Sequence, residues 1–332
     1  MTTDAVLEVE NLVVSFPTDD GLVKAVDGVS FTLAEGETLG IVGESGSGKS
    51  VTSMAIMGLH SKRAQISGSI KFRGQELIGL DERRMRELRG RKVAMVFQDA
   101  LAALNPVFKI GDQISEAMTV HSKQSKSAVT DRVMELMDLV GIPDPTKRIN
   151  QFPHELSGGM RQRIMIAIAI ANDPDVLIAD EPTTALDVTV QAQVLEVIER
   201  IQQNTGTAIM LITHDLGVVA GMADRVLVMY AGRPVEIASV DAIFHEPCHA
   251  YTEGLLASLP RLDRRRDGEK LYRIGGQPPS VIHLPTGCAF APRCARVRPG
   301  ECDVARLELR EVGHDHLSAC VAADEIIKER AQ

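Results

Sequence analysis

The stretch GESGSGKS at residues 43–50 decides the fold, because it satisfies the phosphate-loop pattern G-x-x-x-x-G-K-[ST]. It follows the apolar run TLGIVG at 38–43, which indicates a buried strand, and it opens a helical pattern over 49–59. Glycines let backbone N–H groups surround a phosphate, and the start of a helix adds the positive end of its dipole. We therefore expect the whole loop to bind nucleotide phosphates, with Lys49 reaching the outer phosphates and Ser50 ligating Mg²⁺. The loop residues are Gly43, Glu44, Ser45, Gly46, Ser47, Gly48, Lys49 and Ser50.

Further strand-like segments alternate with helical ones along the chain. Residues 7–16 and 28–33 have the alternating pattern of half-exposed strands, whereas 175–180, 208–214 and 225–232 are continuous apolar runs typical of buried strands. Buried strands alternating with helices predict an α/β domain with a largely parallel core sheet. Residues 81–172 are mostly helical in pattern, which predicts a helical insertion.

An acidic pair follows one of the buried strands. The run DVLIADEP places Asp180 and Glu181 at the carboxyl end of the strand, where ligand sites of α/β sheets lie. We expect Asp180 to hold Mg²⁺ through water and Glu181 to orient or deprotonate an attacking water. His214 ends another buried strand and could contact the terminal phosphate, although a strand-end histidine with no such role fits equally well.

A second glycine-paired turn, HELSGGMRQR at 154–163, lies more than a hundred residues after the first loop. The helix that begins there presents Ser157, Gly158, Gly159 and backbone N–H groups as a second anion site. A simpler interpretation makes Ser157 only the N-cap of that helix. The two interpretations are compatible.

The ordered set GESGSGKS, VFQDALAALNP, LSGGMRQR, VLIADEP, ALD and ITHD resembles the ATP-binding subunits of ABC transporters over residues 5 to about 260. The resemblance implies a P-loop NTPase core with an antiparallel β subdomain and a helical subdomain at about 81–172. It implies that Gln98 senses Mg²⁺ and water, that Asp187 closes the D-loop and that His214 is the switch histidine. Phe16 corresponds by position to the aromatic residue that stacks on adenine. Two such domains would meet head to tail, each lending its signature turn at 157–160 to the other's ATP.

The segments PHELSGGMRQR, TALDVTVQAQ and HAYTEGLL resemble the oligopeptide/dipeptide importer branch, whose chains continue into a small, loop-rich C-terminal extension. Here that extension would span 261–332, with the basic run at 261–267 as a solvated linker. The resemblance implies a peptide importer ATPase on the cytoplasmic side of the cell membrane. Its partners would be two permease subunits, a second ATP-binding subunit, which is homologous or another copy of the chain, and, indirectly, an extracytoplasmic solute-binding protein.

All five cysteines lie at or after residue 248 and none lies in the first 247 residues, which indicates a local device rather than general disulfide stabilisation. Cys288, Cys294, Cys302 and Cys320 lack the C-x₂₋₄-C pairs that zinc sites favour, whereas four thiolates suit an iron–sulfur cluster. Related peptide-transporter ATPases carry a four-iron cluster on this pattern. Zinc and unmetallated thiols are the alternatives, and Cys248 is left free in each case.

Composition and charge limit the other classes of function. The net charge of −9 and the absence of a long Lys/Arg run argue against nucleic acid as a partner. No apolar run approaches the length of a membrane span, and the N-terminus has no signal-peptide pattern. An ABC-type ATPase of DNA repair or translation would normally show tandem cassettes or basic surfaces. A scaffold ATPase of the cluster-assembly type is the other alternative, and the apolar segment after Gln98, where permeases dock in the family, argues against it.

Overall fold

The structure is a computed structural model that describes residues 5–19, 21–122, 124–184, 186–259, 272–282 and 284–330. The chain forms two compact units. The first unit comprises residues 1–8, 32–38 and 71–212, and the second comprises residues 9–31, 39–70 and 213–332. The strands β1 (Ala5–Thr18), β2 (Gly21–Ala34) and β4 (Gln65–Phe72) contribute residues to both units, and β3 and β8, described below, each have one terminal residue in the other unit.

The first unit contains three parallel strands that carry its acidic site. They are β6 (Val93–Val96), β7 (Val176–Asp180) and β8 (Ala208–Thr213). Val93 lies opposite Val176 in one pair, and Val176 lies opposite Ala208 in the other. Every residue of β6 and β7 is buried, as expected for parallel strands with both faces covered. The apolar run at 175–180 therefore ends at Asp180 on the carboxyl edge of this sheet.

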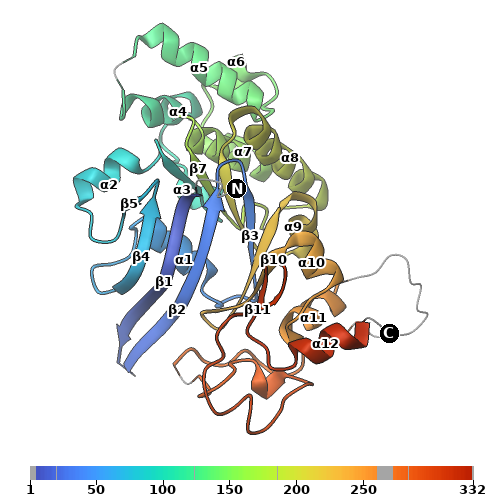
Figure 1. Cartoon of the computed structure of the whole chain (residues 1–332). Helices are drawn as coiled ribbons and strands as arrows, with labels where there is room; N and C mark the ends of the chain where they lie inside the picture. The colour runs from blue at the N-terminus through green and yellow to red at the C-terminus, as the bar shows by residue number, and fades with distance from the viewer. Residues whose placement is uncertain are drawn as a thin grey trace. The chain divides into compact units, whose positions relative to one another are not determined.

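Helices make up most of the remainder of the first unit, and α4, α5 and α7 pack on one another (Figure 1). Each of the longer ones places an apolar stripe inward, such as Val129, Val133, Leu136 and Met137 of α5. A short β5 (Gln75–Glu76) pairs antiparallel with β4. The helical elements are α2 (Glu82–Leu88), α3 (Ala100–Ala103), α4 (Ile110–Thr119), α5 (Lys126–Leu139), α6 (Pro145–Arg148), η1 (Pro153–Glu155), α7 (Gly158–Ala169) and α8 (Val188–Thr205).

The region 81–172 differs in one respect from the mostly helical insertion that the sequence predicts. It includes β6, which pairs with β7 as a strand of the parallel sheet. A run of four apolar residues is too short for its periodicity to separate a strand from a helix. The continuous run of helices begins only after β6.

The second unit contains a sheet in which β3 (Thr38–Val42) pairs parallel with β9 (Arg225–Tyr230). β10 (Arg233–Ser239) continues this sheet antiparallel to β9, and β12 (His316–Ser318) and β11 (Arg310–Gly313) follow it. Two strands of the C-terminal extension, β11 and β12, thus belong to the sheet whose strand β3 leads into the phosphate loop. The helical elements are α1 (Lys49–Ile56), α9 (Leu216–Met222), α10 (Val240–His245), α11 (Ala250–Ala257), η2 (Ala291–Arg293) and α12 (Ala323–Arg330).

A buried carboxylate in the second unit joins β2, β10 and the C-terminal extension. Asp27 accepts a hydrogen bond from Arg233 Nε at 3.0 Å and forms an ion pair with Arg306 Nη1 at 3.2 Å. Burial alone would raise the pKa of Asp27, but the charges of Arg306 and Arg233 outweigh burial and hold it below its ordinary value of 3.8. Its backbone N–H donates to Gly232 O, which places the cluster beside the phosphate loop.

No helix in the described ranges is long and apolar enough to cross a membrane. The expected domain boundary near residue 260 and the basic run at 261–267 lie outside the described residues.

Candidate functional site

The phosphate loop connects β3 to α1 in the second unit, as the sequence predicts. Gly43 has a φ of +154°, and a Cβ there would lie 2.2 Å from Met229 O. Gly48 has a φ of +100°, and its Cβ would lie 2.6 Å from Ala25 O. Only glycine fits at either position. The loop is therefore shaped by backbone contacts from neighbouring segments before any ligand binds.

Lys49 is folded back over this loop. Its ammonium group donates to Gly43 O at 2.8 Å and to Glu44 O at 3.0 Å. The hydroxyl of Ser47 is buried and has no protein hydrogen-bond partner among the described residues, whereas Ser45 and Gly46 are exposed at the tip. Ser50 follows Lys49 in the first turn of α1. A cationic amine, the backbone N–H groups of a glycine-rich turn and a serine hydroxyl fit the phosphates and Mg²⁺ of a nucleotide.

Glu44 joins the phosphate loop to the C-terminal extension, which the sequence analysis did not anticipate. Arg293 binds its carboxylate through two hydrogen bonds, Nη1 to Oε2 at 2.7 Å and Nη2 to Oε1 at 3.1 Å. Arg293 also donates to the hydroxyl oxygen of Tyr230 at 3.1 Å, and the backbone N–H of Glu44 donates to the hydroxyl oxygen of Tyr251 at 2.9 Å. The loop is thus held from outside by two tyrosines and one arginine.

The acidic site lies in the first unit, and there the structure brings two predicted residues together. Gln98 Nε2 donates to Glu181 Oε2 at 3.1 Å, although the two residues are 83 positions apart. The hydroxyl of Thr184 donates to the same oxygen at 2.8 Å. Glu181 has a φ of +49°, a left-handed conformation that is rare for glutamate and common at functional sites. Asp180, the last residue of β7, is buried beside it.

The signature turn forms the start of α7 in the first unit. Ser157 is the N-cap, and its hydroxyl accepts a hydrogen bond from the backbone N–H of Met160 at 3.3 Å. Ser157 and Gly158 are exposed, whereas Gly159 is buried against α8 with Val190 Cγ1 2.3 Å from where a Cβ would lie. The capping role of Ser157 is therefore real, and the exposed start of the helix remains able to bind an anion.

The remaining predicted residues occupy distinct places. Asp187 is exposed and caps α8 by accepting from the backbone N–H groups of Thr189 and Val190. His214 is exposed in the second unit, between β8 and α9. Phe16 lies on β1 and makes an edge-to-face contact with His60, with ring centroids 5.5 Å apart.

The four cysteines of the extension lie in the second unit and form no disulfide. Burial raises the pKa of Cys288 and Cys320, and it raises that of Cys294 to about 11, with smaller contributions from the neighbouring thiols. Each of these four sulfurs has a backbone hydrogen bond: Cys294 from Arg296 N–H at 3.3 Å, Cys302 from Arg298 N–H at 3.4 Å, and Cys288 and Cys320 from backbone groups close by. These bonds offset burial only in part, so the pKa of Cys288, Cys294 and Cys320 stays raised, and a bound cation would be needed to keep these three sulfurs ionised.

The spacing of these sulfurs bears on which metal they suit. Among the described residues, the one group of three or more ligand atoms within 4.8 Å of one another is Glu236, Cys248 and His316, which includes none of the four. Sulfurs around a single zinc ion lie roughly 3.8 Å apart, given Zn–S bonds of about 2.3 Å. The four cysteines are thus spread more widely than a single zinc ion requires.

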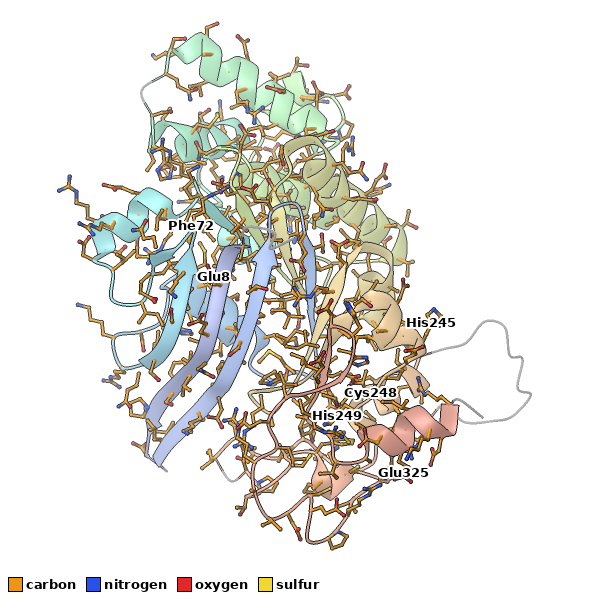
Figure 2. The ribbon with its side chains drawn as sticks, in the orientation of Figure 1. Glu8, Phe72, His245, Cys248, His249 and Glu325 are labelled. Carbon is orange, nitrogen blue, oxygen red and sulfur yellow. The ribbon has the colours of Figure 1, made fainter. Side chains whose placement is uncertain are left out.

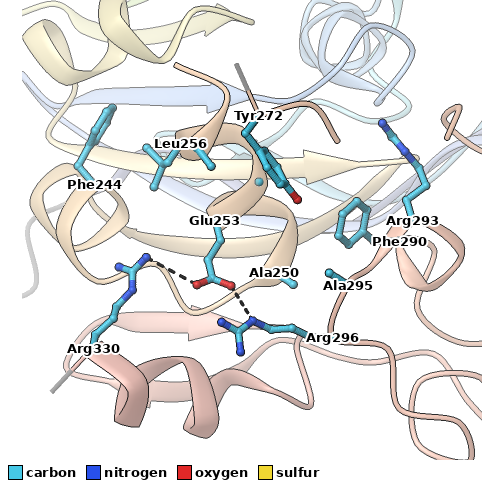
Figure 3. Close-up of a pocket in the computed structure, with 12 residues that line it drawn as sticks. Phe244, Ala250, Glu253, Leu256, Tyr272, Phe290, Arg293, Ala295, Arg296 and Arg330 are labelled. Carbon is cyan, nitrogen blue, oxygen red and sulfur yellow. Dashed lines mark hydrogen bonds and ion pairs between the residues drawn. The ribbon is translucent and has the colours of Figure 1, made fainter. Parts of the chain in front are cut away.

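Ion pairs fasten the extension around a cavity of about 360 Å³ beside α11 (Figure 3). Glu253 lies between Arg296, at 3.0 Å, and Arg330, at 3.7 Å. Arg296 also pairs with Glu329 of α12 at 2.7 Å. These contacts hold the cysteine segment and α12 against α11.

Comparison with known proteins gives consistent matches. Residues 26–184 match the family described as ABC transporter, and residues 235–302 match the family described as oligopeptide/dipeptide transporter, C-terminal region. The dipeptide transport ATP-binding protein DppD of Bacillus subtilis is 53% identical over 308 residues, which cover 90% of this chain and 91% of that protein. The oligopeptide transport ATP-binding protein OppD of Mycobacterium tuberculosis is 53% identical over 96% of this chain, which spans only 52% of that relative's length.

Among solved structures, cbiO1 of Clostridium perfringens, described as part of an ABC transporter complex, has a TM-score of 0.63 and 28% identity. The match covers 73% of this chain and 92% of that one. These likenesses confirm the fold class expected from the sequence, a P-loop core with mixed sheets and helices.

Proposed function

Because this chain belongs to the family of ABC transporter ATP-binding proteins, in its oligopeptide and dipeptide branch, we propose that it is the ATP-hydrolysing subunit of a peptide importer. The observation that carries this proposal is the arrangement around Glu181 in the first unit. Two donors, Gln98 and Thr184, hold one oxygen of the Glu181 carboxylate and so fix its position at the end of β7, where it can orient or deprotonate an attacking water. Phosphoryl transfer to water needs a positioned nucleophile and charge stabilisation more than covalent chemistry.

The nucleotide is the substrate, and each residue type has a role suited to it. Lys49 neutralises the outer phosphates, and Ser50 and Asp180 hold Mg²⁺, the latter through water. Glu181 orients or deprotonates the attacking water, while Gln98 links this carboxylate to the metal. His214 contacts the terminal phosphate, and Phe16 stacks on adenine.

Exposure of the signature turn supports a paired mode of action. Ser157 and Gly158 lie at the surface and offer the positive end of α7 to a ligand outside the chain. We expect each copy to complete the ATP site of a second ATP-binding subunit, head to tail, with Asp187 at the contact. Binding energy then drives association, and hydrolysis releases it.

An exposed apolar surface supports docking to membrane subunits. Phe97, Leu101, Val107 and Phe108 are all large, apolar and exposed, and they lie within twelve positions of one another in the first unit. Large exposed apolar patches mark interaction sites. We propose that this surface binds two permease subunits at the cytoplasmic face of the membrane, where the chain would be peripheral, and that an extracytoplasmic solute-binding protein delivers peptide to them.

We propose further that Cys288, Cys294, Cys302 and Cys320 hold a four-iron cluster that orders the extension. The wide spacing of these sulfurs supports a cluster over a single zinc ion. Protein purified anaerobically should contain iron and absorb in the visible range. Both properties should be lost in Cys294→Ser and kept in Cys248→Ser; colourless, iron-free protein would contradict the assignment.

The ATPase proposal is tested by Glu181→Gln. The glutamine keeps an oxygen for Gln98 and Thr184 but cannot take a proton, so turnover should fall by about 10²-fold or more. ATP affinity should stay within a few-fold, and the closed pair should accumulate. Glu199→Gln, an exposed change on α8, serves as the matched control and should leave both values unchanged. Turnover of Glu181→Gln within a few-fold of the parent would refute the role.

A further inference from the structure

A second group of metal-type ligands lies in the second unit, apart from the four cysteines. Glu236 belongs to β10, Cys248 lies in the connection between α10 and α11 (Figure 2), and His316 begins β12. One ligand atom from each lies within 4.8 Å of the others, and all three side chains are buried. The sequence analysis left Cys248 free, because its two partners lie 12 and 68 positions away.

The backbone fixes the positions of these three residues. β10 and β12 pair antiparallel with Glu236 opposite Ser318, which places His316 near the carboxylate. Ser318 donates its hydroxyl to the carbonyl of Cys248 at 2.9 Å. The backbone N–H of Cys248 donates to Glu236 Oε1. The group is therefore assembled by sheet pairing and by backbone hydrogen bonds rather than by flexible surface side chains.

The hydrogen bonds within the group satisfy only one of the two carboxylate oxygens of Glu236. Glu236 Oε1 accepts from His316 Nε2 at 2.7 Å, and the thiol sulfur of Cys248 lies 3.9 Å from His316 Nδ1. The other carboxylate oxygen, Oε2, is buried and has no protein hydrogen-bond partner among the described residues. The contact with His316 satisfies Oε1 and leaves Oε2 unmatched. A buried carboxylate oxygen without a partner is costly.

His249 follows Cys248 and is fully buried, and its Nε2 has no protein hydrogen-bond partner among the described residues. A cation bound within the group would satisfy Glu236 Oε2 and offset the buried charge of the carboxylate.

We propose that Glu236, Cys248 and His316 bind a divalent transition-metal ion of the zinc class, through one carboxylate oxygen, the thiolate sulfur and one imidazole nitrogen. Thiolate, imidazole and carboxylate are the ligand types that zinc takes in proteins. Binding releases the thiol proton, so two negative ligands balance the doubly charged ion and the buried site becomes neutral. Three protein ligands leave a fourth tetrahedral position for water.

A metal here would have a structural effect distinct from that of the four-cysteine site. It would join β10, the connection from α10 to α11, and β12, which leads directly to Cys320. The strand that brings the last cysteine of the extension would thus be fixed to the sheet independently of any cluster.

The test uses cobalt as the probe, because a thiolate bound to Co²⁺ gives a near-ultraviolet charge-transfer band. The full chain, purified anaerobically with its cysteine site intact and stripped of loosely bound metal by a chelator, is titrated with Co²⁺. We expect one equivalent to bind with the thiolate band, and Zn²⁺ to displace it. Cys248→Ala and His316→Gln should each weaken binding by at least about 100-fold.

His314→Gln is the matched control, and it should keep the band because His314 is exposed and lies outside the group. Cys248→Ala removes only a buried sulfur, and its circular dichroism spectrum shows whether the variant still folds. If the variant does not fold, the second readout is made on the parent chain, where bound Zn²⁺ should protect Cys248 from alkylation. A parent chain that shows neither the cobalt–thiolate band nor the protection of Cys248 from alkylation would overturn the proposal. That result is expected if the group holds only water, or if His316 and Glu236 pair without a metal. A band lost in His314→Gln and kept in His316→Gln would also overturn it.

Discussion

Replacing Arg293 with methionine tests whether the C-terminal extension holds the phosphate loop in its binding conformation. Methionine keeps much of the aliphatic stem and removes the guanidinium group that contacts Glu44. The change cuts two hydrogen bonds to the carboxylate, at 2.7 and 3.1 Å, and one to Tyr230. Glu44 would remain beside Tyr251, with a charge that has lost its bidentate partner.

The magnitude follows from burial. The side chain of Arg293 is only 6% exposed, whereas that of Glu44 is 26% exposed. Removing one partner of a fully buried ion pair costs about 3–5 kcal/mol, and an exposed pair is worth about 0–1 kcal/mol. With one partner buried and the other a quarter exposed, we expect a loss of about 2 kcal/mol. If half of this loss, about 1 kcal/mol, destabilises the binding conformation of the phosphate loop, ATP affinity falls roughly fivefold.

The assay is a double-mutant cycle on ATP affinity and on the free energy of unfolding. Arg293→Met and Glu44→Gln are measured separately and together, and the coupling between them should be about 1–2 kcal/mol. Arg298→Met is the matched control, because Arg298 belongs to the same segment but pairs with Glu325 rather than with the loop. We expect the control to leave ATP affinity unchanged.

Two results would refute this reasoning. Additive effects of Arg293→Met and Glu44→Gln would show that the ion pair carries no coupling. An unchanged ATP affinity with lowered stability would show that Arg293 fastens the extension without shaping the loop. A rise in KM for ATP with kcat unchanged is the expected pattern, because the arginine acts on binding and lies outside the acidic site.

Three further predictions concern packing, pH and docking. Gly159→Ala should lower the free energy of unfolding by about 1–3 kcal/mol because its Cβ meets Val190, whereas Gly158→Ala, with 3.8 Å of space, should not; denaturant titration distinguishes them. Because folding lowers the pKa of Asp27, this carboxylate contributes to the free energy of unfolding at pH values above its ordinary pKa of 3.8. That contribution is lost as the pH falls through the lowered pKa. Asp27→Asn should therefore be less stable at pH 7 and should lose less stability between pH 5 and about pH 2. Val107→Asp should abolish co-purification with permease subunits and leave the ATPase activity of the isolated chain unchanged, and normal co-purification would exclude this surface.

Local motifs made much of the nucleotide site predictable. The phosphate loop, the strand that ends at Asp180 and the helix that begins after Ser157 are each defined by fewer than ten consecutive residues. Their chemistry depends on backbone geometry that glycine, an apolar run or an N-cap specifies directly. The pairing of Gln98 with Glu181 was not predictable from local pattern, because the four apolar residues of β6 before Gln98 do not distinguish a strand from a helix, and only the family resemblance assigned Gln98 to the site.

Contacts between distant segments could not be predicted in the same way. Arg293 reaches Glu44 across 249 positions, and nothing in the local pattern of either residue identifies its partner. His316 and Glu236 meet because a three-residue strand adds to the edge of the sheet, and so short a strand gives no periodic signal. Side chains brought together by such pairings become visible only when the sheet order is known.

The position of Arg293 gives the extension a physical route to the nucleotide. It ends η2 and directly precedes Cys294, so the order of the cysteine segment determines how well its guanidinium group is held at Glu44. Because a short, loop-rich segment has little apolar core of its own, its order depends on ion pairs such as Arg296 with Glu253 and on whatever the cysteines bind. Loss of the ion pairs, or of the group that the cysteines bind, would release Arg293 from Glu44. The phosphate loop would then have to become ordered as ATP binds, which costs conformational entropy. The extension therefore acts on ATP binding through the order of the phosphate loop rather than through contact with the nucleotide.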